Sequence, residues 1–244
     1  MISSADYHKS LESLPLATFE AMVGDRAIVV IAPHPDDESL GCGGLLAWAA
    51  NHGRRIKVIF LTDGEGSHPG STAIPPLLLA KIRIREGRLA ATHLGVVNSS
   101  LEFMHLPDGS LPTMNEETAT TVAEQLRTTI EQLAPCVVFV TASTDPHGDH
   151  QRAYELAAIA VHDLVDCPLF AYPIWSWVLP EGSELPEPCG HRVDISGLRE
   201  KKADAIAAHA SQHGQVVRDS EAPFVLPKLL LERLNSGYEI YLDA

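Results

Sequence analysis

Two short polar segments of the 244-residue chain contain the residue types that bind metals and move protons. Residues 33–38 read PHPDDE and place the imidazole of His34 beside three consecutive acids. Residues 145–150 read DPHGDH and hold two imidazoles three positions apart. Imidazoles and carboxylates bind Zn²⁺ and Fe²⁺, and both groups also act as general acids and bases. Together the segments predict a metal site of two histidines and one carboxylate with vacant coordination positions.

Each segment alone has a simpler interpretation. Acidic side chains stabilise the positive end of a helix, so the acids at 36–38 are also typical of a helix N-terminus. Two histidines three positions apart in an acidic, histidine-rich chain are often surface residues. Three consecutive acids exceed what capping needs, however, and Pro35 restricts the backbone beside them. The two segments together therefore indicate a metal site more specifically than either does alone.

Both segments follow strands of a predicted parallel sheet. Short β-branched runs alternate with longer stretches of helical periodicity, which is the pattern of repeated βαβ units. We expect strands at 27–32, 56–61, 101–105, 136–141 and 169–174, and helices at 40–50, 77–94, 117–133 and 150–164. In such sheets ligands bind beyond the carboxyl ends of the strands. The loops after the first and fourth of these strands are therefore expected to open on the same rim.

The predicted fold is a single-domain α/β fold: a Rossmann-like, doubly wound and mostly parallel sheet with helices on both faces. One domain is expected to span residues 1–244, with residues 1–24 packed on it as an N-terminal extension. Residues 176–190 are rich in Pro, Glu and Gly and predict a loop. Edge strands at 192–195 and 238–242 are expected around a helix at 198–209.

The overall composition argues against several classes of partner. The chain carries 32 acidic and 18 basic residues, a formal net charge of −14, without a basic cluster suited to nucleic acid or an anionic membrane surface. No apolar run reaches the roughly 18 residues of a membrane span, and no signal-peptide segment is evident. Four widely spaced cysteines without a C-x-x-C pair are typical of reduced thiols. A cytoplasmic protein is expected, and the formation of a homo-oligomer stays open.

The same segments carry a resemblance to a known family. The chain resembles the PIG-L/LmbE family of zinc-dependent N-acetylglucosaminyl deacetylases over most of its length. The matching segments are 32–38 (APHPDDE), the glycines of 41–44, 83–95, 106–109, 146–150 (PHGDH) and 202–212. One departure is Gly148, where many members of the family carry Pro. We expect this glycine to loosen the loop without removing a ligand.

The resemblance implies a role for each polar residue of the two segments. The implied metal ligands, for Zn²⁺ or another divalent ion such as Fe²⁺, are His34, Asp37 and His150. Asp36 would be the general base that takes a proton from the attacking water. His147 would be the acid or the partner that stabilises the oxyanion, and Asp149 would orient His147.

Three further residues are candidate substrate contacts. Arg83 either bonds sugar hydroxyls or pairs with Glu86 one helical turn away. Asp108 lies in a Pro-Asp-Gly sequence typical of turns, and the resemblance makes it a sugar-hydroxyl ligand. Trp175 either stacks on a sugar ring or belongs to the core, and strand alternation would place it on the same face as Trp177.

The expected function is metal-dependent removal of the N-acetyl group from an N-acetylglucosamine-type sugar or its glycoside. An amidase of the same family that cleaves a larger amide, such as a thiol conjugate, is an alternative, and a non-catalytic sugar-binding module is a more distant one. A nucleotide-binding module fits poorly, because the glycines of 41–44 lack the G-x-G-x-x-G spacing and follow three acids. Residues 63–76 are expected to form a mobile loop over the pocket. Of the twelve histidines, His68 and His209 are weaker candidates for the site.

Overall fold

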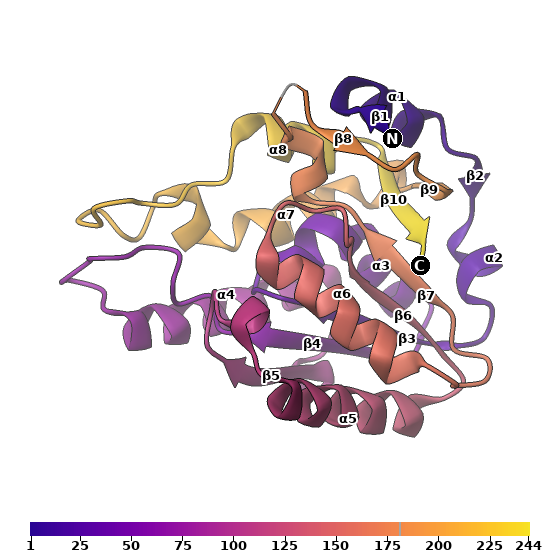
Figure 1. Cartoon of the computed structure of the whole chain (residues 1–244), viewed down its shortest axis with the longest axis horizontal. Coiled ribbons are helices and arrows are strands. Elements are labelled where there is room, and N and C mark those ends of the chain that lie inside the picture. The colour runs from indigo at the N-terminus through magenta and orange to yellow at the C-terminus, as the bar shows by residue number, and fades with distance from the viewer. Residues whose placement is uncertain (181) are drawn as a thin grey trace.

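A mixed sheet of eight strands forms the centre of the molecule in the computed structural model, which describes residues 1–180 and 182–244. The strand order is β2-β9-β10-β7-β6-β3-β4-β5 (Figure 1). The strands are β2 (Leu16–Ala17), β3 (Ala27–Ala32), β4 (Ile56–Thr62), β5 (Leu101–Leu106), β6 (Cys136–Thr141), β7 (Leu169–Tyr172), β9 (Gly190–Asp194) and β10 (Tyr238–Asp243). A separate antiparallel pair joins β1 (Ile2–Ser3) to β8 (Glu184–Leu185). Position 181, within the predicted 176–190 loop, lies outside the described residues.

The five strands β7-β6-β3-β4-β5 run parallel, and the order of the chain reverses beside β3. From β3 the chain proceeds outward to β4 and β5, then returns to the other side of β3 for β6 and β7. Open α/β sheets bind their ligands at such a reversal point, where the neighbouring loops diverge. The loops that leave β3 and β6 are the two segments with the metal-binding residue types.

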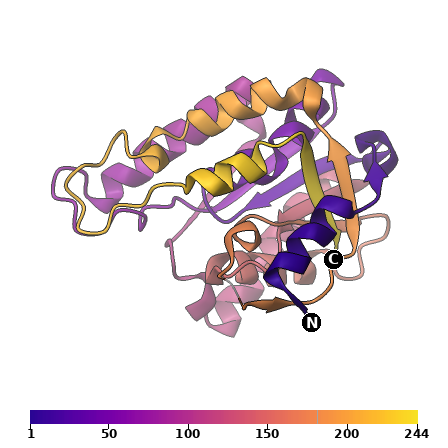
Figure 2. The ribbon, with the colours of Figure 1, turned by 90° about the horizontal axis from the view of Figure 1, so that it is seen from above.

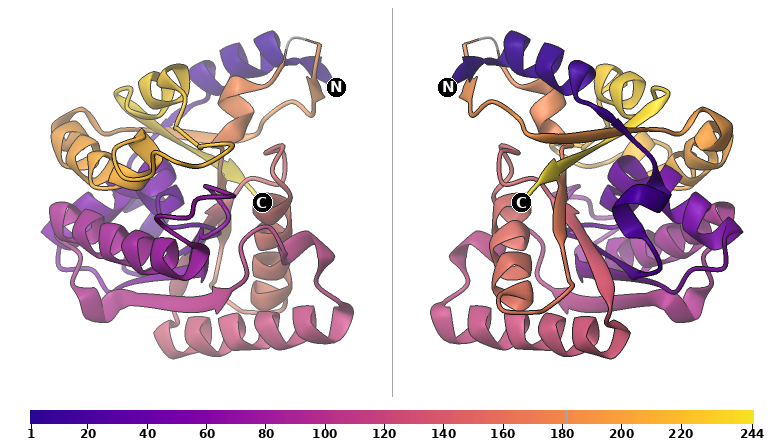
Figure 3. Two further views of the ribbon diagram at one scale, coloured as in Figure 1. Left: turned by 90° about the vertical axis from the view of Figure 1, so that its left-hand side faces the viewer. Right: turned by 90° about the vertical axis from the view of Figure 1, so that its right-hand side faces the viewer.

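Helices cover both faces of this sheet, as Figure 3 shows. One face carries α3 (Asp37–Asn51), α4 (Pro76–Leu94) and α7 (Arg199–Ala207), and the other carries α5 (Glu116–Leu133) and α6 (Gly148–Val161). Because successive strand residues point to opposite faces, Val30 of β3 packs in one hydrophobic cluster and Val29 in the other. The predicted α/β fold, a mostly parallel sheet with helices on both faces, is confirmed.

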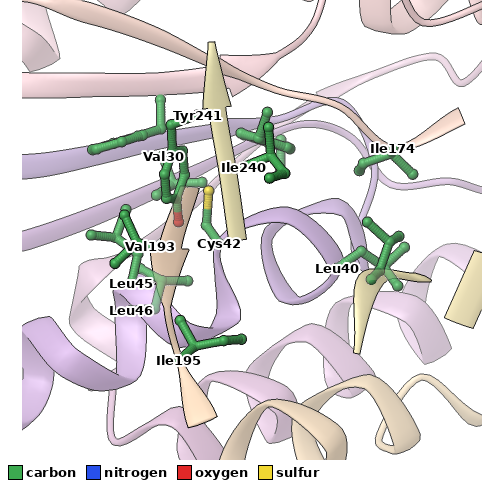
Figure 4. Close-up of a cluster of buried hydrophobic side chains, with 14 of the residues drawn as sticks. Val30, Leu40, Cys42, Leu45, Leu46, Ile174, Val193, Ile195, Ile240 and Tyr241 are labelled. Atoms are coloured by element: carbon green, nitrogen blue, oxygen red, sulfur yellow. The ribbon is translucent and has the colours of Figure 1, made fainter. Parts of the chain in front are cut away.

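Glycines allow α3 to lie very close to its neighbours. A Cβ atom added at Gly41 would come within 2.1 Å of the Tyr172 ring, and one at Gly44 within 2.5 Å of Ile195. The larger side chains of α3 pack with β9 and β10, and Cys42 points toward Tyr241 (Figure 4). The glycines after the acidic segment therefore serve close packing of a buried helix, whose first residue belongs to the site.

The C-terminal strands differ from expectation. Both β9 and β10 are interior strands, because β10 lies antiparallel between β7 and β9, and β2 pairs beyond β9. A two-residue strand such as β2 has no pattern of its own, so the sequence could not reveal that it forms the edge. The predicted 176–190 loop contains β8, and the end of the predicted strand 169–174 is irregular because β7 stops at Tyr172.

Further short elements complete the chain. They are α1 (Ser4–Ser13), α2 (Phe19–Val23), α8 (Lys228–Leu234) and the 3₁₀ turns Asn98–Ser100, Leu111–Thr113, Trp175–Val178, Ser196–Leu198 and Ala210–His213. Tyr7 and Leu11 of α1 are fully buried and belong to the same hydrophobic cluster as Val30. Figure 2 shows α1 near the C-terminal strands. Among the described residues, no helix combines the length and apolar character needed to cross a membrane.

Candidate active site

The loops after β3 and β6 meet in a pocket of about 330 Å³. Its lining includes seven of the nine site residues predicted from the sequence, namely His34, Asp36, Asp37, Arg83, Asp108, His147 and Trp175. The other two, Asp149 and His150, are almost completely buried, with exposed fractions of 1% and 0%. All nine therefore gather around one cavity at the reversal point of the sheet.

His34, Asp37 and His150 form a buried cluster whose chemistry fits a divalent cation. One ligand atom of each lies within 4.8 Å of the others. Nδ1 of His34 is 3.2 Å from Asp37 Oδ2, and Nε2 of His150 is 3.4 Å from Asp37 Oδ1. This Nε2 is buried and has no hydrogen-bond partner, which is costly unless something else satisfies it. Two imidazoles and one carboxylate are a donor set suited to Zn²⁺ or Fe²⁺.

Asp145 holds the ring of His150 in place. Its fully buried carboxylate lies 2.9 Å from Nδ1 of His150 and accepts the backbone N–H groups of Ile174 and Ser176 at 3.0 and 2.9 Å. Because a carboxylate only accepts, the ring proton sits on Nδ1 and the lone pair of Nε2 faces Asp37. The sequence does not reveal this role, because an aspartate shortly before a helix is equally typical of a cap.

The carboxylate of Asp149 lies against His34, whereas the contact of Asp149 with His147 is made by its backbone N–H. Asp149 Oδ2 is 3.1 Å from Nε2 of His34 and accepts the N–H of Gly109 at 2.8 Å. Asp108 Oδ1 is 3.0 Å from the same histidine nitrogen. These two carboxylates hold a proton on Nε2 of His34 and so direct its Nδ1 toward the cation cluster. Burial by itself would lower the pKa of His34, but the hydrogen bonds to Asp108, Asp149 and Asp37 together with the charge of Asp37 outweigh it and raise that pKa.

The ring of His147 is held by the backbone. The N–H of Asp149 donates to Nδ1 of His147 at 3.2 Å, so the neutral ring carries its proton on Nε2. Burial, followed by the neighbouring imidazoles of His150 and His34, lowers the pKa of His147 to about 4. His147 therefore lines the pocket as a neutral hydrogen-bond donor.

Asp36 is separate from the cation cluster although it precedes a member of it. It stands at the N-terminus of α3, yet its side chain makes no capping hydrogen bond, so capping does not explain this residue. Burial raises the pKa of Asp36 to about 6, and the nearby guanidinium of Arg83 offsets part of that effect. A carboxylate with a pKa close to neutrality is suited to general base catalysis.

Arg83 secures the loops around Asp36. One terminal nitrogen lies 3.2 Å from Asp36 Oδ1 and donates to the carbonyl of Pro35 at 2.8 Å, and the other donates to the carbonyl of Gly64 at 2.8 Å. The alternative pairing with Glu86 is wrong, because the Glu86 carboxylate accepts the N–H and hydroxyl of Ser211 instead. Arg83 nevertheless lines the pocket, so a contact with substrate stays a prediction.

Trp175 lines the pocket, whereas Trp177 does not. Trp175 begins a 3₁₀ turn, so the alternation of a strand does not apply, and the prediction that the two rings share one face is wrong. The ring centroid of Trp175 lies 5.9 Å from that of Phe224, which also lines the pocket. Trp177 is buried and stacks on His8. No sequence motif marks Phe224, which reaches the site from a distant loop.

Hydrogen bonds join the predicted loop 63–76 to the loop 214–227, and both loops extend to the left in Figure 1. Asp219 accepts the hydroxyl of Ser71 at 2.6 Å and the N–H of Ala73 at 2.9 Å. These hydrogen bonds lower the pKa of Asp219 to about 2. Of the weaker histidine candidates, His68 is a buried residue of the loop 63–76, and His209 is buried with its Nε2 3.3 Å from Glu38 Oε1.

Gly148, the departure from the family pattern, is explained by a neighbouring proline. A Cβ atom at this position would lie 2.6 Å from Cγ of Pro112, so a larger residue would require one of the two segments to move. His150 keeps its place in the cation cluster beside this glycine. The expected retention of the ligand is therefore consistent with the geometry.

Comparisons with known proteins show the family of the chain. The model of the PIG-L family, described as GlcNAc-PI de-N-acetylase, matches residues 29–161, which include both site loops. The chain is 27% identical over 223 residues to a diacetylchitobiose deacetylase of Thermococcus kodakarensis, covering 87% of this chain and 80% of that protein. It is 29% identical over 239 residues to a 1D-myo-inositol 2-acetamido-2-deoxy-alpha-D-glucopyranoside deacetylase of Corynebacterium urealyticum, covering 77% and 71%.

A solved structure shows the same fold. The N,N'-diacetylchitobiose deacetylase of Pyrococcus horikoshii matches with a TM-score of 0.67 and 21% identity, covering 97% of this chain and 91% of that one. The family match spans more than half of the chain and contains the cation cluster, Asp36 and His147. The protein is thus a member of the PIG-L (GlcNAc-PI de-N-acetylase) family.

Proposed function

We propose that this protein is a metal-dependent hydrolase that removes the N-acetyl group from an N-acetylglucosamine-type sugar or its glycoside. The observation that carries the proposal is the buried cluster of His34, Asp37 and His150 at a pocket that also presents Asp36 and His147. Relatives named as deacetylases of such sugars support the substrate class.

The residues at and around the cluster have separate roles in amide hydrolysis. A Zn²⁺ or Fe²⁺ ion held by the three ligands would supply Lewis acidity toward the amide carbonyl and toward water. Asp36 takes the proton of the attacking water, because its carboxylate lines the pocket without belonging to the cluster. Asp36 and Asp37 thus perform different tasks although they are neighbours in the chain.

His147 supplies a hydrogen-bond donor to the substrate. Because its Nδ1 accepts the N–H of Asp149, its Nε2–H is the group available to a substrate in the pocket. This N–H donates to the carbonyl oxygen as negative charge develops there, and the proton that Asp36 took from water passes to the leaving amine as the C–N bond breaks. Removal of one such donor typically lowers a hydrolytic rate by about a hundredfold or more.

The remaining walls of the pocket suit a sugar with an attached group. Asp108 and Arg83 offer polar atoms for hydroxyl groups, and Trp175 and Phe224 offer an aromatic surface. Sugar rings present an apolar face on which aromatic rings pack. The pocket volume of about 330 Å³ falls in the range of small-molecule sites.

The test combines metal analysis with a screen for acetate release. Purified protein is assayed for bound metal and then for acetate release from N-acetylglucosamine, its glycosides and N,N'-diacetylchitobiose, before and after chelation. We expect stoichiometric metal, and equal amounts of acetate and free amine that disappear on chelation and return with Zn²⁺ or Fe²⁺. Release of a bulkier acid from other amides, with no acetate, would instead identify the alternative amidase. Sugar binding without any hydrolysis would identify a binding module and refute the proposal.

A further inference from the structure

The backbone of Asp36 has a conformation that residues with a Cβ atom rarely adopt. Its φ is 146° and its ψ is −28°. Contact of the side chain with the backbone disfavours positive φ, so surrounding structure must hold such a residue in place. At this position the neighbouring carboxylates have different partners. That of Asp36 approaches Arg83, and that of Asp37 approaches His34 and His150.

The carboxylate of Glu38 binds the strained peptide directly. The N–H of Asp36 donates to Glu38 Oε2 at 2.9 Å, and the hydroxyl of Ser39 donates to Oε1 at 2.6 Å. Glu38 is 2% exposed, does not belong to the cation cluster and does not line the pocket. The proposed hydrolytic chemistry therefore gives this buried charge no task.

His209 provides the counterpart of Glu38 from a distant part of the chain. It follows α7, is fully buried, and places Nε2 3.3 Å from Glu38 Oε1. Burial of a carboxylate costs free energy unless the group is paired and hydrogen-bonded. The contact with His209 therefore offsets the cost of burying Glu38. The family model ends at residue 161, and His209 belongs to the segment 202–212 that also resembles the family.

We propose that Glu38 and His209 are a positioning pair that fixes the backbone of Asp36 and so aims its carboxylate into the pocket. The inference rests on the proposed function, in which Asp36 is the general base. A simpler interpretation is that Glu38 only satisfies a free N–H at the start of α3, as acids in the first helical turn commonly do. That interpretation predicts lower stability without a specific loss of catalysis, whereas a positioning pair acts on kcat through Asp36.

The experiment compares Glu38→Ala, Glu38→Gln and His209→Gln with a matched control, Glu239→Gln. Glu239 is also a buried carboxylate, 1% exposed in its side chain, paired with Lys202 at 2.7 Å and bound to the N–H of Gly44 at 2.7 Å. We expect every variant to lower the melting temperature. Glu38→Ala should lower kcat by about a hundredfold with unchanged KM and metal content, because small displacements of a reacting group have effects of this size. The control Glu239→Gln should keep the wild-type kcat. Glu38→Gln keeps an acceptor oxygen and should recover part of kcat, and His209→Gln should lower kcat to an intermediate value.

Two measurements separate positioning from general damage. In an Asp36→Asn background, Glu38→Ala should cause no further loss of kcat, because the pair acts through the Asp36 carboxylate. An equal loss in that background, or wild-type kcat in Glu38→Ala, would overturn the proposal. A crystal structure of Glu38→Ala should show Asp36 with negative φ, and a φ that stays near 146° would also overturn it. The φ of Asp36 can be measured without any enzymatic activity. The crystal structure therefore tests the positioning pair even if the wild-type protein releases no acetate and the proposed function fails.

Discussion

Asp145→Asn tests how the protein presents His150 to a metal. Oδ1 of Asp145 accepts the N–H and the hydroxyl of Ser176, whereas Oδ2 lies 2.9 Å from Nδ1 of His150. An asparagine of the same shape keeps its oxygen toward Ser176, where two donors converge, and therefore turns its NH₂ group toward His150. An NH₂ group donates to Nδ1 and moves the imidazole proton to Nε2, the nitrogen that a cation needs.

The expected loss is substantial because the Asp145 side chain is fully buried and water cannot replace it. Removal of a hydrogen-bond partner behind a metal-binding histidine typically weakens metal affinity ten- to a hundredfold, or about 1.4–2.8 kcal/mol. The N–H of Ile174 loses the closer of its two acceptors, Oδ2 at 3.0 Å, and keeps Oδ1 at 3.2 Å. Loss of one such hydrogen bond should lower the free energy of unfolding by about 1 kcal/mol.

The assay is a titration of metal-free protein with Zn²⁺ in competition with a chromophoric chelator, together with a thermal melt. Glu239→Gln is the control, because it changes a buried carboxylate that also accepts backbone N–H groups outside the cation cluster. We expect the control to lose stability and keep its affinity for Zn²⁺. A folded Asp145→Asn protein that binds Zn²⁺ as tightly as the wild type would refute the argument about the His150 proton.

Three other predictions concern the base, the aromatic wall and the loop contact. Asp36→Ala should retain metal and lower acetate release by about a hundred- to ten-thousandfold, whereas His150→Ala should lose the metal. Metal analysis and kinetics on both variants check this, and wild-type release by Asp36→Ala would exclude Asp36 as the base. Trp175→Ala should raise KM for a disaccharide more than KM for N-acetylglucosamine in steady-state kinetics, and equal changes would contradict a stacking role for this ring. Asp219 has a pKa of about 2 in the folded protein, below its ordinary 3.8. Its stabilising effect should therefore be complete well above pH 4 and disappear as the pH falls toward 2. Melting temperatures of wild type and Asp219→Asn should converge over that range, and a difference independent of pH would contradict the assignment.

The central strands could be located from the sequence because their signal is local. The predicted strands 27–32 and 136–141 coincide with β3 and β6, since strands buried on both faces appear as continuous apolar runs. The β2 edge of the sheet lacked such a signal. Residues 16–17 form β2 only because β9 offers them a partner, and β10 is interior only because β2 and β9 lie beyond it.

The hydrogen-bond partners of the histidines could not be predicted from spacing. Asp149 is two residues from His147, yet its carboxylate contacts His34, 115 residues away in the chain. Asp145 similarly holds His150 together with the N–H groups that follow β7. A carboxylate reaches its partner according to the direction of the backbone at each strand end, and sequence distance does not encode that direction.

The sequence by itself determined that the residues of the two polar loops gather at one site. Both polar loops follow neighbouring parallel strands, and the parallel arrangement brings the ends of such strands to one rim. Only the tertiary structure decided what each group faces. The divergence of Asp36 and Asp37 depends on a positive φ beside the contact between Glu38 and His209, and the aromatic wall depends on Phe224 from a distant loop. Local residue preferences establish strands and loops, whereas these contacts exist only after distant segments have packed together.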